Sequence, residues 1–477
     1  MSRTKRRFEQ FQDMIARLYP PQITEAGEDE EYDSTKKNMA RPVTFQVTDS
    51  CNLACKYCYQ INKGKRRMSF ETAKKFIDLL LTGDKGMDNY ISKETTPAIS
   101  LEFIGGEPFL EIELIDQIVD YFRKRTIELG HPWADKFAIS ICSNGVLFND
   151  ERVQRFLLKN RSRMSFSVTI DGNKELHDSC RVFPDGTGSY DLAVEAAKSW
   201  MDRGYYMGSK ITIAPGNLEH LTSAIQHMID LGYDDINANC VYEEGWTLDH
   251  ARLFYKKLKE VADVLLENSE KEIYCSLFEE IFFKPKDPTD TENWCGGNGM
   301  MISCDPDGYI YPCIRYMESS LGESQKPVRI GDVDRGVGTT QAYQNCIECV
   351  KCITRKTQST DECYYCPIAD GCSWCQAYNY QISGNFHTRA TYICEMHKAR
   401  ALANVYYWNK LYEKEGTPQY MELWVPDKWA LAIVSEEELS SLKSLVEQRK
   451  EQGFECVNKP LEIAKKAFEE FWKKIKT

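Results

Sequence analysis

The sequence predicts an α/β protein with three parts, and three observations support this prediction. Strand-like apolar segments alternate with helix-like segments from residue 43 to residue 269. Continuous alternation of this kind predicts a parallel sheet with right-handed crossovers. Eleven of the 19 cysteines lie between residues 291 and 394, which predicts a separate Cys-rich, loop-rich module. Residues 395–477 mostly follow helical apolar patterns, so they predict a helical tail.

Six strand–helix units account for the first part. We expect Ser69 to cap the first helix, because its hydroxyl can accept a backbone N–H of the opening turn. The predicted strands cover residues 42–48, 98–104, 137–142, 164–170, 206–213 and 235–239, and the predicted helices cover residues 69–81, 110–129, 150–159, 190–203, 217–231 and 247–269. Six units form either an open doubly wound sheet or an incomplete barrel. In both folds, ligands bind at the C-terminal ends of the strands.

The composition excludes several classes of protein. With 477 residues, 42% hydrophobic and 28% charged, the chain suits a globular fold with a large core. A net charge of −12 argues against general nucleic-acid binding. No uncharged apolar run reaches the ~18 residues of a membrane helix, and no apolar segment follows the basic N-terminus. We therefore expect a cytoplasmic protein without membrane or nucleic-acid partners, whose cysteines serve metal or redox chemistry rather than disulfides.

Three cysteines follow the first predicted strand directly. Cys51, Cys55 and Cys58 have the spacing C-x3-C-x2-C. Three thiolates at this spacing leave one iron of a [4Fe–4S] cluster free for another ligand. The alternative is a zinc site whose fourth ligand is distant in the sequence, because structural zinc ions take four protein ligands.

This motif resembles that of the radical S-adenosylmethionine (radical SAM) superfamily, in which an aromatic residue precedes the last cysteine. The resemblance implies a partial (β/α)6 TIM-like barrel that binds S-adenosylmethionine and one [4Fe–4S] cluster. It implies these cofactor contacts: Tyr57, Gly105, Gly106, Glu107, Asn144, Thr169, Asp171 and Arg181. In relatives the Gly-Gly-Glu-Pro motif binds the amino group of the cofactor, the hydroxyl at the place of Thr169 contacts the ribose, and an arginine pairs with the carboxylate, a contact that a guanidinium makes well.

Eight cysteines of the second part resemble a SPASM domain, which carries two auxiliary [4Fe–4S] clusters. The resemblance thus implies three clusters in all. One auxiliary cluster would use Cys295, Cys304, Cys313 and Cys375, and the other would use Cys363, Cys366, Cys372 and Cys394. A zinc ribbon or paired zinc sites are the alternative, since Cys-x2-Cys pairs are equally typical of zinc.

Two features depart from the SPASM pattern. Only two residues separate Cys372 from Cys375, where the family usually has three, so the role of Cys375 is open. Cys346, Cys349 and Cys352 form an additional C-x2-C-x2-C run. This run replaces a ligand, forms another metal site or binds a substrate thiol.

The resemblance implies an enzyme, since most SPASM-bearing radical SAM proteins modify peptides or proteins. We expect a maturase that installs thioether crosslinks in a ribosomally made, Cys-containing precursor peptide, through hydrogen abstraction by a 5′-deoxyadenosyl radical supplied with electrons by an external donor. Carbon–carbon crosslinking, sulfatase maturation, and a non-catalytic iron–sulfur or zinc protein are the alternatives. Sulfatase-maturing relatives carry a basic aspartate where this chain has Ile314, which cannot accept a proton. The sequence nominates no other general base.

These assignments divide the chain into four predicted segments. They are an N-terminal extension over residues 1–40, the partial barrel over 41–275, the SPASM-like module over 276–400 and the helical tail over 401–477. The extension is short and polar, so we expect a peptide substrate to be recognised by another surface or by a separate protein.

Overall fold

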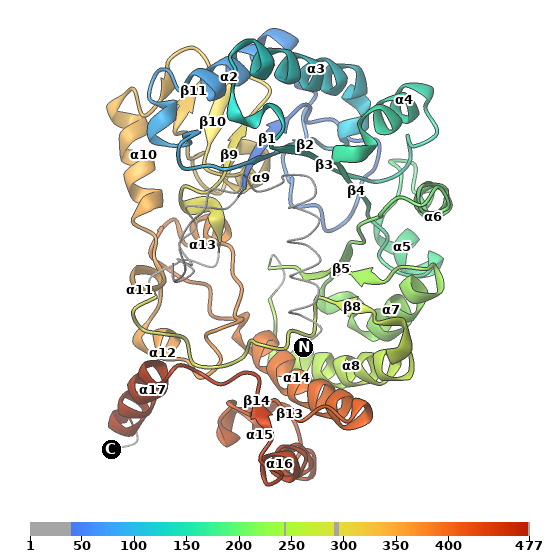
Figure 1. Cartoon of the computed structure of the whole chain (residues 1–477), viewed down its shortest axis with the longest axis vertical. Coiled ribbons are helices and arrows are strands. Elements are labelled where there is room, and N and C mark those ends of the chain that lie inside the picture. The colour runs from blue at the N-terminus through green and yellow to red at the C-terminus, as the bar shows by residue number, and fades with distance from the viewer. Residues whose placement is uncertain (1–39, 243–244, 291–294, 476–477) are drawn as a thin grey trace, which may run out of the picture.

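The computed structural model describes residues 40–242, 245–290 and 295–475. Its centre is an eight-stranded sheet with the order β12-β11-β10-β9-β1-β2-β3-β4 (Figure 1). The strands are β1 (Arg41–Gln46), β2 (Ile99–Ile104), β3 (Phe137–Ser143), β4 (Met164–Val168), β9 (Ile302–Cys304), β10 (Tyr309–Tyr311), β11 (Gly331–Asp332) and β12 (Gly336–Val337). The predicted extension lies outside the described residues, except for its last position.

The first four strands pair in parallel, as the alternating pattern predicts. Helices α2 (Phe70–Thr82), α3 (Ile112–Glu128) and α4 (Glu151–Asn160) connect them and cover the outer face of the sheet (Figure 1). Ser69 caps α2 as predicted, accepting a hydrogen bond from the backbone N–H of Thr72 at 3.0 Å. Gly83 ends α2 with a φ of 73°, a conformation that suits glycine.

The second half of the barrel has short, separate strand pairs. Strand β5 (Ile211–Ile213) pairs with β7 (Ala238–Cys240), and β6 (Asp235–Ile236) pairs with β8 (Tyr274–Cys275). The predicted sixth strand is therefore two strands with different partners. Helices α5 (Lys174–Cys180) and α6 (Tyr190–Met201) precede β5, α7 (Leu221–Asp230) lies between β5 and β6, and α8 (Leu248–Glu267) lies between β7 and β8. Helix α5 was not predicted, because its seven residues are too few to show a helical period.

The Cys-rich module continues the barrel sheet. Strand β9 pairs in parallel with β1, with Phe45 opposite Cys304, and β10, β11 and β12 add antiparallel strands beyond it. Without this pairing, β1 would present an unpaired hydrogen-bonding edge. One sheet and one hydrophobic core thus include residues on both sides of the predicted boundary at residue 275. The barrel and the module differ in cysteine content, but they are packed together as one body.

Helices make up most of the rest of the chain. The module contains α9 (Glu318–Leu321), α10 (Gln341–Lys351), α11 (Arg355–Gln358), α12 (Asp361–Tyr364) and α13 (Gln376–Ser383). The tail is α14 (Cys394–Glu415), α15 (Asp427–Ile433), α16 (Glu436–Lys450) and α17 (Glu462–Ile475), with the short pair β13 (Gln419–Tyr420) and β14 (Glu455–Cys456). The predicted helical tail is confirmed, and its first helix begins inside the predicted module. In the described part of the chain, no helix is both long and apolar enough to span a membrane.

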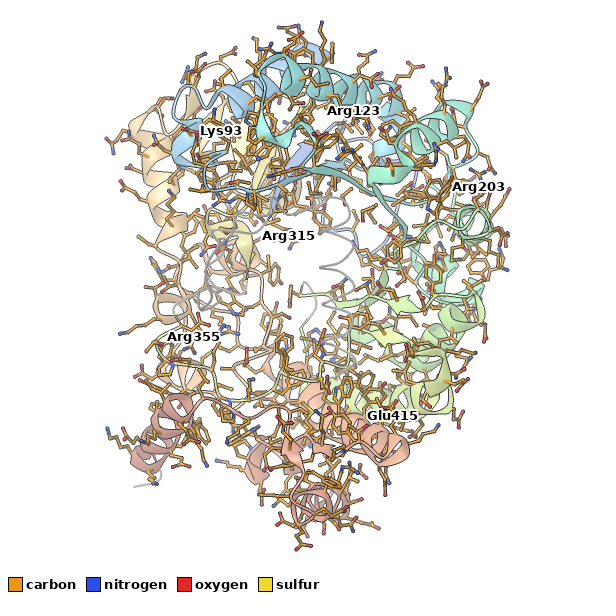
Figure 2. The ribbon with its side chains drawn as sticks, in the orientation of Figure 1. Lys93, Arg123, Arg203, Arg315, Arg355 and Glu415 are labelled. Atoms are coloured by element: carbon orange, nitrogen blue, oxygen red, sulfur yellow. The ribbon has the colours of Figure 1, made fainter. Side chains whose placement is uncertain are left out.

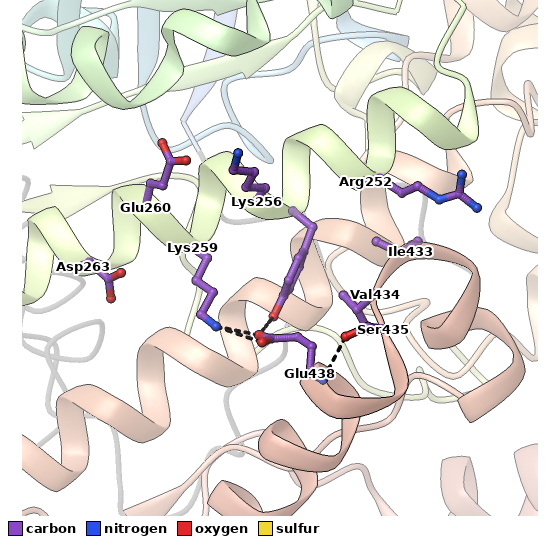
Figure 3. Close-up of a pocket in the computed structure, with 10 residues that line it drawn as sticks. Arg252, Lys256, Lys259, Glu260, Asp263, Ile433, Val434, Ser435 and Glu438 are labelled. Atoms are coloured by element: carbon purple, nitrogen blue, oxygen red, sulfur yellow. Dashed lines mark hydrogen bonds and ion pairs between the residues drawn. The ribbon is translucent and has the colours of Figure 1, made fainter.

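The tail packs on the barrel through α14 and α16. Lys259 on α8 pairs with Glu438 on α16 at 2.7 Å, and the hydroxyl of Tyr255 donates to the same carboxylate at 2.5 Å. These groups line a pocket of about 390 Å³ between α8 and the tail (Figure 3). Four of its ten lining residues, Tyr255, Lys259, Ser435 and Glu438, are hydrogen-bonded to one another, and it holds none of the predicted site residues. We therefore treat it as part of the tail–barrel contact.

We expect Asn404→Leu to destabilise the protein by about 2 kcal/mol or more. The buried Asn404 amide accepts from the N–H of Glu279 at 2.7 Å and donates to the carbonyl of Leu277 at 2.9 Å. Its loss leaves backbone groups unsatisfied, at about 1–3 kcal/mol each. The thermal midpoint followed by circular dichroism checks this. Lys410→Ala, at an exposed site on the same helix, is the control, and equal midpoints for the two variants would contradict the prediction.

Candidate functional site

The three-cysteine motif lies in the loop that follows β1. Two backbone hydrogen bonds hold the loop. The N–H of Ala54 donates to the carbonyl of Val182 at 2.7 Å, and the N–H of Glu107 donates to the carbonyl of Ser50 at 2.9 Å. Burial raises the pKa of the Cys51 and Cys55 thiols, and each pKa is raised further by a neighbouring thiol of the motif. The loop thus brings the three predicted ligands together at the C-terminal end of the sheet.

Gly106 gives the cysteine loop its close contact with the end of β2. A Cβ at this position would lie 2.3 Å from the carbonyl oxygen of Ser50 and 2.6 Å from the Cβ of Cys51. Real Cβ atoms do not approach so closely, so a side chain here would push the loop away. A Cβ at Gly105 would likewise lie only 2.8 Å from the carbonyl oxygen of Thr48.

Glu107 joins the ends of β2 and β3 through a buried carboxylate. Its oxygens accept from the hydroxyl of Ser143 at 2.8 Å, the N–H of Asn144 at 2.9 Å and the N–H of Phe109 at 3.1 Å. Burial raises its pKa, although these donors oppose the shift. A carboxylate has about four acceptor sites. Three are occupied here, which leaves one for a cationic group such as the amino group of a ligand.

Tyr57, Asp171 and Arg181 meet beside the cysteine loop. The hydroxyl of Tyr57 donates to the carboxylate of Asp171 and accepts from the guanidinium of Arg181 at 3.0 Å. The Nε of Arg181 is buried and has no hydrogen-bond partner among the described residues. An arginine in this position has a free donor for an anionic group, which is the role that the resemblance implies.

Two further predicted contacts lie at neighbouring strand ends. The Asn144 amide donates to the side chain of Asn52 in the cysteine loop at 2.7 Å. Thr169 is buried beside Cys142, with its hydroxyl 3.5 Å from the Cys142 sulfur. The structure therefore places all eight predicted cofactor contacts around one end of the barrel.

Three of the four cysteines predicted for one auxiliary cluster come together. Burial raises the pKa of Cys313, and the thiols of Cys295 and Cys375 raise it further. Cys375 is the N-cap residue of α13. The two-residue spacing before Cys375 therefore does not keep it from Cys313.

Cys304 lies apart from these three cysteines. In the β9–β10 ladder it is opposite Ile310, and both pack in the main core, whereas Tyr311 and Cys313 pack in a second apolar cluster. Successive residues of a strand point to opposite faces of its sheet. Cys304 thus faces the main core, and among the described residues the charged group that acts on its pKa is Asp305.

The second auxiliary group is complete. Burial raises the pKa of Cys394 to about 12, with contributions from the Cys372 and Cys363 thiols, and Cys366 is affected by all three of these cysteines. Arg389 was not predicted to belong to this site. Its guanidinium donates to the sulfur of Cys363 at 3.0 Å and to that of Cys372 at 3.1 Å. No sequence motif marks Arg389. Its position five residues before Cys394, the last predicted ligand of this group, is the one signal that could have suggested it.

The additional C-x2-C-x2-C run joins neither group. Cys346 and Cys349 lie on α10, and Cys352 ends that helix. Cys346 is half-buried next to Tyr380, whereas Cys349 and Cys352 are exposed.

The two parts of the site face each other across Arg315. Its guanidinium lies 5.1 Å from the ring of Tyr59 in the cysteine loop and 5.8 Å from that of Tyr378 on α13 (Figure 2). Because Arg315 follows Cys313 by two residues, it connects the first auxiliary group to the barrel site.

The described cysteine groups do not surround a single metal ion. Throughout the described ranges, no three His, Cys, Asp or Glu side chains meet closely enough to hold one. A zinc ion, with Zn–S bonds of about 2.3 Å, would draw its thiolates to within about 4 Å of one another. A [4Fe–4S] cluster takes its thiolates at separate irons and does not need them to meet at one ion.

Comparisons with known proteins agree with this geometry. Residues 40–174 match a family model described as a 4Fe-4S single cluster domain. The radical SAM cyclopropyl synthase TigE of Paramaledivibacter caminithermalis is 20% identical over 354 residues, which cover 70% of this chain and 67% of that protein. The chain is thus similar to proteins of the radical SAM superfamily.

Other relatives of this chain are maturation and biosynthesis proteins. A serine-type anaerobic sulfatase-maturating enzyme of Bacteroides thetaiotaomicron is 28% identical over 39% of this chain and 43% of its own length. The antilisterial bacteriocin subtilosin biosynthesis protein AlbA of Bacillus subtilis is 24% identical over 60% of this chain and 57% of its own length. The chain thus spans about half the length of these curated relatives.

The fold also resembles that of a solved structure. The structure of anSMEcpe with bound AdoMet has a TM-score of 0.57 and 17% identity, and the match covers 84% of this chain and 99% of that one. The predicted α/β fold with a partial barrel is therefore confirmed.

We expect the stability of the protein to fall below pH 6.5, with a contribution from His177. Its ring is fully buried and accepts from the N–H of Asp171, and burial, assisted by Arg181, lowers its pKa to about 3. Between pH 6.5 and about 3 the unfolded chain binds a proton that the folded chain does not. This costs about 1.4 kcal/mol of stability per pH unit.

Thermal midpoints measured between pH 7.5 and pH 5 check this contribution. They should fall less steeply in His177→Gln than in His220→Gln, which alters an exposed histidine. Parallel pH profiles for the two variants would show that His177 is not responsible.

Proposed function

We propose that this chain is a radical SAM maturase that modifies a ribosomally made peptide. The observation that carries the proposal is the meeting of the three-cysteine loop with Glu107, Tyr57, Asp171 and Arg181 at one end of the barrel. When bound, a [4Fe–4S] cluster and S-adenosylmethionine would supply an organic radical able to abstract hydrogen.

The protein residues would bind and orient the cofactor. Arg181 would hold its carboxylate through the guanidinium donor that has no protein partner, and Glu107 would accept its amino group at the remaining carboxylate site. Asp171 keeps the Tyr57 hydroxyl in place, because its other oxygen is fixed by the N–H of Thr212 at 3.1 Å. Burial of these groups excludes water, which protects a reactive radical.

Two auxiliary clusters would complete the enzyme, giving three in all. Cys363, Cys366, Cys372 and Cys394 would bind one, and Cys295, Cys313 and Cys375 supply thiolates for the other. An external electron donor would reduce them. Electron delivery close to the radical site gives clusters in this position a function.

A peptide is the substrate class that the relatives support. The sporulation killing factor maturation protein SkfB of Bacillus subtilis is 19% identical over 60% of this chain. Thioether crosslinking is our first choice of reaction, because the exposed thiols of Cys349 and Cys352 offer a place for a Cys-containing peptide to bind. Sulfatase maturation is less well supported, since Ile314 packs against an apolar cluster and offers no base. Alkylation of product thiols separates the reactions, because thioether formation consumes cysteine thiols.

We expect Cys51→Ala to abolish reductive cleavage of S-adenosylmethionine by the anaerobically reconstituted protein. The variant lacks one of the three thiolates that hold the first cluster, so it should also lose about four of about twelve irons. Cys456→Ala, which alters a cysteine of the tail, is the matched control. Zinc without iron in the purified protein, or no cleavage by the fully loaded wild type, would favour a non-catalytic metalloprotein.

We expect Arg181→Lys to weaken the binding of S-adenosylmethionine about tenfold or more. A lysine keeps the charge but loses the planar fork that binds a carboxylate, and one charged hydrogen bond is worth about 1.5–3 kcal/mol. Anaerobic calorimetric titration measures the dissociation constant. Arg203→Lys, on the outer surface, should leave it unchanged, and an unchanged constant in Arg181→Lys would remove this residue from the cofactor site.

A further inference from the structure

The first auxiliary group has only three cysteines in the structure. A [4Fe–4S] cluster usually takes four thiolate ligands, and the ladder register turns Cys304 toward the opposite face of the sheet. A cluster bound by Cys295, Cys313 and Cys375 would therefore have one iron without a thiolate.

Tyr316 stands next to these three cysteines. It follows Cys313 in a tight turn, with its N–H donating to the Cys313 carbonyl at 3.1 Å and its own carbonyl accepting from the N–H of Val328 at 3.1 Å. The side chain is 0% exposed, and its hydroxyl has no hydrogen-bond partner among the described residues. Buried hydroxyls almost always have a partner, so an orphan of this kind needs an explanation.

The cysteine thiols of the first auxiliary group lie around the Tyr316 side chain. Burial raises the pKa of Tyr316, and the thiols of Cys313, Cys375 and Cys295 all raise it further. Tyr316 and Cys313 pack in one apolar cluster, and Cys375 packs against it. The Tyr316 hydroxyl thus lies in the same cluster as these sulfurs without being hydrogen-bonded to any of them.

We propose that the phenolic oxygen of Tyr316 is the fourth protein ligand of an iron–sulfur cluster bound by Cys295, Cys313 and Cys375. On binding, the phenol gives its proton to solvent and an Fe–O bond forms, with no change in oxidation state. The proposal rests on the proposed function, which places a cluster in this group.

Two other side chains fit this role less well. The hydroxyl of Tyr90 is also buried without a partner in the described residues, but Cys313 is the one thiol of the group that acts on it. Cys346 packs against the same apolar cluster, but Cys349 is the thiol that acts on it, and none of Cys295, Cys313 and Cys375 does.

Iron analysis and electron paramagnetic resonance of the reconstituted full-length protein test the proposal. We expect Tyr316→Phe to hold about one iron less per chain than the wild type and to give a three-iron cluster signal after mild oxidation. Tyr316→His, which restores a ligand, should recover that iron. Tyr311→Phe is the matched control, because Tyr311 is equally buried and its hydroxyl already donates to Asp305 at 3.0 Å.

Three outcomes would overturn the proposal. The first is the same iron content and spectrum in Tyr316→Phe as in the wild type. The second is loss of the iron in Tyr90→Phe instead. The third is a wild type with only about four irons, which also removes the auxiliary clusters from the proposed function while leaving cleavage of S-adenosylmethionine intact. Failure of cleavage with normal iron content would instead count against the proposed function alone.

Discussion

The pairing of β1 on both of its edges holds the functional parts of this protein together. On one side β1 pairs with β2, whose end carries the two glycines and Glu107, and on the other it pairs with β9, the first strand of the module. The cysteine loop leaves from the end of the same strand. One strand of six residues therefore determines how the first cysteine group lies relative to the module that carries the others.

Polar contacts in the barrel site are unusually interdependent. Glu107 fixes Ser143 and Asn144, Asn144 in turn fixes Asn52 in the cysteine loop, and Tyr57 connects that loop to Asp171 and Arg181. Buried networks of this kind stabilise a structure only when nearly every member is satisfied. Two buried donors of this network have no partner among the described residues, the Nδ2 of Asn52 and the Nε of Arg181, and an anionic ligand would complete the network at Arg181.

The sequence was sufficient to predict the features that depend on local patterns. The first four strands, the cap at Ser69 and the cysteine loop follow from runs of a few residues, and the structure shows them at the expected places. Cys304 shows where this reasoning fails, because the face on which a cysteine lies depends on ladder register, and β9 pairs with residues far away in the chain. Arg389 was missed for a related reason: its partners Cys363 and Cys372 are brought to it only by tertiary folding.

The short segment from Cys372 to Cys375 joins two different groups of thiols. Three residues of chain span at most about 10 Å, so these two sulfur-bearing positions cannot move far apart, whatever the rest of the module does. The segment therefore sets an upper limit on the separation of the two groups of thiols, through covalent bonds alone. If both groups held clusters, an electron passing between them would cross a gap of limited length.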